Sequence, residues 1–155
     1  MSNRTGTQNY TCNATIGTYS TTGTAEAELF DVTQFYTGDN KTIVSVPIIS
    51  DLQPVGSHLF VPSPLAPGSA APKFENAHNF VIGAKNNSVP SVPPNFSVTS
   101  VLLKNIQPGK AGGSLANWVV RTNAIGGVVP PELNKCTAGD TIAIPYKANY
   151  LFFAD

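Results

Sequence analysis

The sequence predicts an all-β protein: an antiparallel β-sandwich of jelly-roll-like form, with about eight or nine strands and long loops rich in proline and glycine. Three observations lead to this prediction. The 155-residue chain carries 13 prolines and 13 glycines, spread along its length. No long stretch keeps the 3.6-residue apolar period of a helix, and β-branched or aromatic runs alternate with turn residues.

Nine runs have the composition of strands, and turn residues bound each of them. The run Ala25–Asp31 is well patterned, because small or apolar residues alternate there with Glu26 and Glu28. The last run is one bent strand or two, broken near Pro145. In chain order the runs are Thr7–Cys12, Gly17–Thr22, Ala25–Asp31, Thr42–Ile49, His58–Val61, Phe80–Lys85, Ser97–Ile106, Asn117–Asn123 and Asp140–Phe153.

The segments between these runs predict loops rather than helices. Residues 62–72 contain four prolines, which cannot donate hydrogen bonds to a sheet. Residues 88–95 form a second proline-rich loop, and residues 126–139 a third. Ala111–Ala116 is the one segment with some helical character, and its two glycines weaken that reading. Loops longer than tight hairpins need favour a sandwich with crossing connections, and residues 1–155 read as a single domain.

Composition excludes several classes of function. Charged residues are only 12% of the chain, and nine basic residues balance nine acidic ones. A neutral chain of this kind has no field to attract nucleic acid. No apolar run approaches the roughly 20 residues of a membrane-spanning helix. The polarity comes instead from Ser, Thr and Asn, which suits an extracellular protein.

Sequons and cysteines point to the secretory route. Six Asn-x-Ser/Thr sequons are candidates for N-linked glycosylation. Cys12 and Cys136 are the only cysteines and can form one disulfide, which we expect in a secreted chain; the alternative is two buried thiols. The candidate glycosylation sites are Asn3, Asn9, Asn13, Asn40, Asn86 and Asn95.

Aromatic and polar residues near turns are the candidates for ligand binding. Tyr36 lies beside the polar turn that contains Asp39 and Asn40, and an exposed aromatic ring next to such side chains could stack on a sugar. His58 and Trp118 complete the set of candidate binding residues. The predicted partner is a glycan or a cell-surface ligand.

Motifs of catalysis are missing. The sequence has no Gly-x-Ser-x-Gly elbow, no dinucleotide fingerprint and no phosphate-binding loop, and its two histidines, His58 and His78, lack the spacing of a helical zinc pair. Glu26 and Glu28 read as solvated charges on one strand face. We therefore predict no catalytic residue, no cofactor and no metal site, and we expect a binding protein rather than an enzyme.

Several short blocks resemble a known family. Gly6-Thr7-Gln8-Asn9-Tyr10-Thr11-Cys12 is the most specific, and it is followed by Ala27-Glu28-Leu29-Phe30-Asp31, His58-Leu59-Phe60-Val61-Pro62 and Arg121-Thr122-Asn123-Ala124-Ile125-Gly126-Gly127. In this order they look like the fungal branch of domain of unknown function 3455, secreted proteins often labelled malate dehydrogenase. The resemblance implies an extracellular protein without a settled activity. Many members have a further cysteine near the position of Thr33 here.

The malate dehydrogenase label is not expected to hold, because a short, strand-rich chain without the fingerprint offers no cradle for a dinucleotide. The sequence instead predicts a secreted, non-catalytic, lectin-like binding protein. One alternative is a cytotoxic or membrane-active defence protein, with Ser97–Ile106 as the strand that converts. A second is a hydrolase that uses His58 or His78 with a nearby carboxylate.

Overall fold

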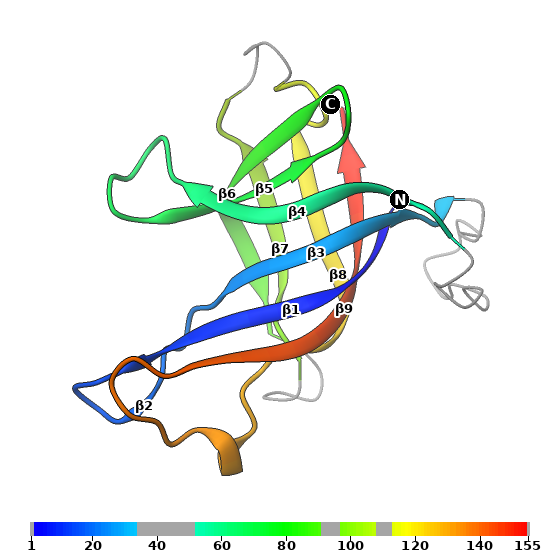
Figure 1. Cartoon of the computed structure of the whole chain (residues 1–155). Helices are drawn as coiled ribbons and strands as arrows, with labels where there is room; N and C mark the ends of the chain where they lie inside the picture. The colour runs from blue at the N-terminus through cyan, green and yellow to red at the C-terminus, as the bar shows by residue number, and fades with distance from the viewer. Residues whose placement is uncertain (1, 34–51, 91–96, 108–112, 155) are drawn as a thin grey trace.

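The computed structural model describes residues 2–33, 52–90, 97–107 and 113–154 (Figure 1). These residues form nine β-strands and one short 3-10 helix, η3 (Pro131–Leu133). The strands are β1 (Ser2–Asn13), β2 (Thr18–Tyr19), β3 (Thr24–Asp31), β4 (Pro54–Pro62), β5 (Ala70–Glu75), β6 (Phe80–Val89), β7 (Ser100–Asn105), β8 (Trp118–Gly126) and β9 (Thr141–Phe153).

The strands close into a barrel. Every neighbouring pair is antiparallel, in the order β1-β3-β4-β5-β6-β7-β8-β9, and β9 pairs again with β1. That closing ladder runs from Ser2 opposite Tyr150 to Thr11 opposite Thr141, and Figure 1 shows the two strands crossing the molecule together. β2 pairs with β1 alone and lies outside the ring of eight strands. The all-β, antiparallel prediction is confirmed.

The predicted jelly-roll-like sandwich is wrong, because one sheet curls until its first and last long strands meet. A sandwich and a barrel both bury one face of each strand, so the alternation of apolar and polar residues is the same in both. The crossing connections that long loops suggested do not occur among the described strands. From β3 to β9 each strand pairs with its neighbour in the chain.

Proline misled the prediction of individual strands. β5 was predicted in part as loop, yet Pro72 lies within it, opposite Phe60 of β4. β9 is one continuous strand through Pro145, which lies opposite Thr7 of β1. The pairing of β9 with β8 has an irregularity further along, between Thr122 and Ile125. The predicted strand Thr42–Ile49 lies outside the described residues. Residues 113–116, the described part of the weak helical candidate, are not helical.

One end of the barrel is filled by a hydrophobic core. Successive side chains of β3 point to opposite faces of the strand. Ala25, Ala27 and Leu29 therefore point inward and are buried, and Glu26 and Glu28 are exposed. Ala25 and Leu29 join a buried cluster whose largest members are Phe74, Val81, Leu103, Val119, Tyr146 and Tyr150.

Asn105, at the end of β7, seals the closed end. Its Nδ2 donates to the carbonyl oxygens of Gly113 at 3.0 Å and Ala116 at 2.8 Å. Its Oδ1 accepts from the backbone N–H of Gln107 at 2.9 Å. A buried amide with all of these partners is a stable way to hold the connection to β8 across the barrel end. The open space of the barrel therefore lies at the opposite end.

Candidate functional site

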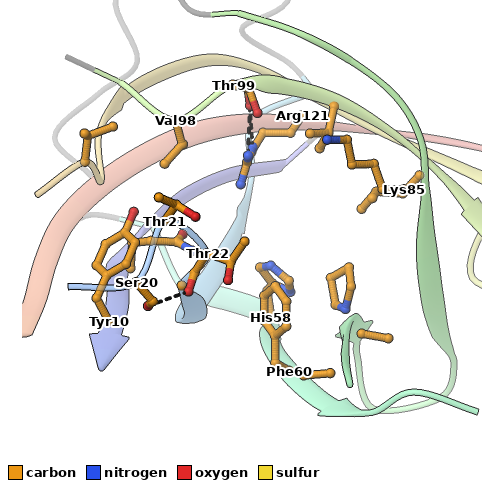
Figure 2. Close-up of a pocket in the computed structure, with 18 of the residues that line it drawn as sticks. Tyr10, Ser20, Thr21, Thr22, His58, Phe60, Lys85, Val98, Thr99 and Arg121 are labelled. Atoms are coloured by element: carbon orange, nitrogen blue, oxygen red, sulfur yellow. Dashed lines mark hydrogen bonds between the residues drawn. The ribbon is translucent and has the colours of Figure 1, made fainter. Parts of the chain in front are cut away.

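A cavity of about 1000 Å³ occupies the other end of the barrel. Its mouth lies among the connections β2–β3, β4–β5, β6–β7 and β8–β9, whose described residues line it (Figure 2). An eight-stranded barrel has an interior that side chains can just fill, or that can hold one small ligand. Here small residues such as Ala71 and Gly83 line the wall and leave the space open.

The bottom of the cavity is aromatic. His58 of β4 is only 3% exposed and stacks on Phe74 of β5, with ring centroids 4.0 Å apart and planes 7° apart. Phe60 and Tyr150 lie beside the His58 ring, with centroids at 5.6 and 5.7 Å. We call His58, Phe60, Phe74 and Tyr150 the aromatic floor. His58, Phe74 and Tyr150 are at most 3% exposed and Phe60 is half-buried, so the floor is a packed aromatic layer that presents mainly Phe60 to the cavity.

The Nδ1 atom of His58 is 2.7 Å from the backbone oxygen of Lys73. A carbonyl oxygen only accepts hydrogen bonds, so Nδ1 carries the hydrogen and donates it. This bond fixes the ring against Phe74 and makes His58 a part of the floor. The mouth-side wall above it is polar and small, with Ser20, Thr21 and Thr22 from the β2–β3 connection.

Two cationic side chains line the same cavity. Arg121 of β8 donates from Nε at 3.0 Å and from Nη2 at 2.8 Å to the backbone oxygen of Thr99. Lys85 of β6, which is exposed, also lines the cavity. Figure 2 shows the Arg121 guanidinium extending from the wall toward the space that Thr22 and His58 border. No Asp or Glu is among the described residues that line the cavity.

Tyr10 of β1 links the wall of the cavity to the connection between β8 and β9. Its hydroxyl donates a buried hydrogen bond to the backbone oxygen of Gly127. Burial raises the pKa of Tyr10 above its ordinary 10.0, and the nearby positive charge of Arg121 opposes part of that rise. Tyr10 is therefore neutral at physiological pH and holds its hydrogen bond.

Residues 127–140, which we call the mouth loop, are fastened to the β1–β2 hairpin. A disulfide joins Cys12 to Cys136, as the sequence predicted. The backbone N–H of Cys136 donates to the carbonyl of Gly17 at 3.0 Å, and that of Tyr19 donates to Oδ1 of Asn134 at 3.2 Å. These bonds hold one side of the cavity mouth in place.

The predicted binding residues do not come together in the described part of the chain. His58 belongs to the aromatic floor. Trp118 of β8 precedes the fully buried Val119 and so faces the opposite side of the wall, where the Lys104 Nζ lies 5.6 Å from the centre of its ring. Tyr36, Asp39 and Asn40 lie outside the described residues.

Two of the predicted sequons are well exposed. Asn13 lies at the turn after β1, where its Oδ1 accepts from the backbone N–H of Thr15 at 3.0 Å, and Asn86 is exposed on β6. Asn9 is half-buried in β1, and its Oδ1 is buried. Asn3 lies in β1, but only its backbone is described. Asn40 and Asn95 lie outside the described residues.

The two histidines lie apart. His78 is exposed in the turn between β5 and β6, at the closed end, whereas His58 lies in the cavity at the open end. Within the described ranges no group of three or more His, Cys, Asp or Glu side chains is placed to hold a metal ion.

Sequence reasoning missed Arg121 and Lys85. A signal for Arg121 was present. Arg121 lies two residues after Val119 in β8, so both side chains point to the same face of the strand. Val119 is fully buried, so the charged side chain of Arg121 is on the inward face. That signal needs a known inward face, which the sequence did not supply.

The fold and the site define a class: closed antiparallel β-barrels with a mainly apolar internal cavity that opens at one end. The chain belongs to the family described as protein of unknown function (DUF3455), whose family model matches residues 2–154. This confirms the family that the sequence blocks suggested; the fungal branch within it stays a prediction. No curated protein and no solved structure is similar enough to match it. Where the structure is described, it contains no helix long and apolar enough to cross a membrane.

Proposed function

We propose that this protein is a non-catalytic binding protein that takes a small, largely apolar ligand into the open end of its barrel. The observation that supports this proposal is the cavity of about 1000 Å³ above the aromatic floor. Cavities that bind small molecules are concave, mainly apolar and supplied with a few polar groups that orient the ligand. The cavity has each of these properties.

The residues at the floor favour binding over hydrolysis. Nδ1 of His58 donates to Lys73 and its ring is stacked on Phe74, so the imidazole is held in place as a packing group.

A ligand in this cavity differs from the carbohydrate that the sequence suggested. The sugar-binding hypothesis depended on an exposed aromatic ring beside polar turn residues, and its centre, Tyr36, lies outside the described residues. It stays a prediction, as does the membrane-active alternative. The cavity favours an apolar ligand because burial of its surface against the aromatic floor contributes about 25 cal/mol per Å².

We place this binding protein outside the cell. The disulfide between Cys12 and Cys136 is of a kind that persists in oxidising compartments, and Asn13 and Asn86 present exposed sequons. Glycopeptide mass spectrometry of the protein from its natural source tests this part. Glycans on Asn13 or Asn86 are expected, and an unmodified chain with reduced cysteines would contradict it.

Binding is tested with a neutral apolar fluorescent probe, N-phenyl-1-naphthylamine, displaced by dodecanol. We expect saturable binding, and loss of affinity by about tenfold or more when Thr22→Trp fills the mouth with an indole ring. Thr24→Trp is the matched control, because Thr24 is exposed two residues further on and does not line the cavity. The proposal fails if the probe does not bind, or if Thr22→Trp binds it as well as the wild-type protein does.

A further inference from the structure

We infer that the ligand of this cavity is an amphiphile with a single anionic oxyacid head, which Arg121 and Lys85 bind while the apolar body lies on the aromatic floor. The inference rests on the proposed function and names the chemical class of its ligand. Three observations carry it: an oriented guanidinium inside the barrel wall, a second cation in the same cavity, and no acidic side chain among the described residues that line it.

Arg121 is oriented in advance for an anion. Its Nε and Nη2 both donate to the carbonyl oxygen of Thr99, which fixes the plane of the guanidinium. A guanidinium carries five N–H donors, so this contact leaves others for a ligand. The one ion pair among the described residues joins Lys73 and Glu75. Arg121 thus has no carboxylate partner within the described ranges, and a planar fork of donors matches an oxyacid better than any neutral group does.

Lys85 adds a second positive charge. It lies on β6 opposite Leu103 of β7, whose side chain belongs to the core cluster inside the barrel. Lys104, one residue further along β7, is exposed and lies over the outer ring of Trp118 instead. Two lysines on neighbouring strands therefore face opposite sides of the wall, and Lys85 is the one that lines the cavity.

The charge in the cavity is a local property. The whole chain carries nine basic and nine acidic residues, so its net charge is zero. The described lining of the cavity has two cationic side chains and no acidic one, so its local charge is positive. Tyr10 does not compensate the charge, because burial keeps its phenol protonated at neutral pH.

The cation of β8 lies beside the floor. The aromatic floor is built from β4, β5 and β9, and Arg121 of β8 lies opposite Tyr150, a member of that floor. An anionic head bound by Arg121 therefore leaves the apolar body of the ligand next to the floor. Carboxylate and phosphate heads share this chemistry, and their relative affinities distinguish them.

The test compares ligands that differ only in the head group. Dodecanoate, dodecyl phosphate and dodecanol each displace the neutral probe from the wild-type protein at low salt and neutral pH. We expect at least one of the two anions to bind about tenfold tighter than the alcohol, and added salt to weaken the anion but not the alcohol. The better anion identifies the head.

Three variants locate the effect. Arg121→Gln and Lys85→Gln are each expected to lower the affinity for the anion several-fold while the affinity for dodecanol stays within about twofold. Lys104→Gln removes the same charge from the outer face and is expected to change neither. If Arg121→Gln does not fold, the salt dependence of the wild-type protein and the Lys85→Gln variant still decide the matter.

The outcomes separate this inference from the function on which it rests. Equal affinities for dodecanoate, dodecyl phosphate and dodecanol would overturn the inference and leave the binding function standing. An anion preference that survives both cavity variants would overturn the roles of Arg121 and Lys85. Failure of all three ligands and of the probe would overturn the binding function itself.

Discussion

The hydroxyl of Tyr10 donates a hydrogen bond to the carbonyl oxygen of Gly127, a residue 117 positions further along the chain. Tyr10 lies in the first strand and Gly127 begins the mouth loop between the last two strands. This bond and the Cys12–Cys136 disulfide both connect β1 to the mouth loop, at the end of the barrel where the cavity opens. The cavity mouth is therefore stabilised by contacts between residues far apart in the sequence.

Tyr10→Phe is expected to lower the free energy of unfolding by about 1–2 kcal/mol, because it leaves the buried carbonyl of Gly127 without its donor. Urea unfolding of the variant and the wild-type protein measures this change. Tyr19→Phe is the control, since the Tyr19 side chain also lines the cavity but makes no described hydrogen bond through its hydroxyl. Equal losses in both variants would contradict the role given to Tyr10.

Tyr10 also predicts a loss of stability in alkali. Its pKa in the folded protein lies above the ordinary value of 10.0. Above pH 10 the unfolded chain releases a proton that the folded protein keeps, so the free energy of unfolding falls as the pH rises toward the folded pKa. Below pH 10 this contribution is fully present. The stability difference between the wild-type protein and Tyr10→Phe should therefore shrink in alkali; a constant difference would contradict this.

Removal of the disulfide is expected to cost about 2–5 kcal/mol, because the bond closes a long loop in the unfolded chain. The two cysteines are separated by 124 positions. The double variant Cys12→Ser, Cys136→Ser should also bind the neutral probe more weakly, since the mouth loop loses its covalent attachment. Calorimetry gives the stability and probe titration the affinity. A double variant that matches the wild-type protein in both measurements would contradict the prediction.

The seal of the closed end is tested by Asn105→Ala. This substitution removes three hydrogen bonds and exposes none of their partners to solvent, so we expect a loss of about 3 kcal/mol. Asn117→Ala is the control: its Nδ2 donates to the carbonyl of Ala154 at the same end, but the residue is exposed. The control should lose less than about 1 kcal/mol. Similar losses of unfolding free energy in the two variants would contradict the role given to Asn105 at the closed end.

Gln8 offers a change in the opposite direction. Its side chain lines the cavity, and its Oε1 is buried without a hydrogen-bond partner among the described residues. Gln8→Leu keeps the approximate shape and removes an unpaired polar atom, so the free energy of unfolding should rise by about 1 kcal/mol. Thermal unfolding measures it, and a lower melting temperature would contradict the assignment of Gln8 as an unpaired group.

Local patterns in the sequence were enough to predict most of the described strands, but not β5, and to predict the disulfide. The alternation around Glu26 and Glu28 identified β3 and its inward face. The two cysteines allowed a single pairing. Each of these inferences depends on residues whose spacing or number carries the information directly.

Properties that depend on long-range pairing were not predictable in the same way. The choice between a sandwich and a barrel rests on whether Ser2 lies opposite Tyr150, and nothing in the composition of either strand specifies the partner. The cavity follows from that closure. Pro72 and Pro145 were read as strand breakers, yet both lie within paired strands, opposite Phe60 and Thr7. Arg121 became recognisable as a cavity residue only after the inward face of β8 was known.

The pairing of β1 with β9 has a consequence for biosynthesis. β1 leaves the ribosome early, and one of its two flanking partners is made only when synthesis reaches residues 141–153. At typical translation speeds the wait is on the order of ten seconds. During that time the nascent chain carries an unsatisfied strand that could join a neighbouring polypeptide. A chaperone that covers β1 until the last strand arrives would therefore raise the yield of correctly folded protein.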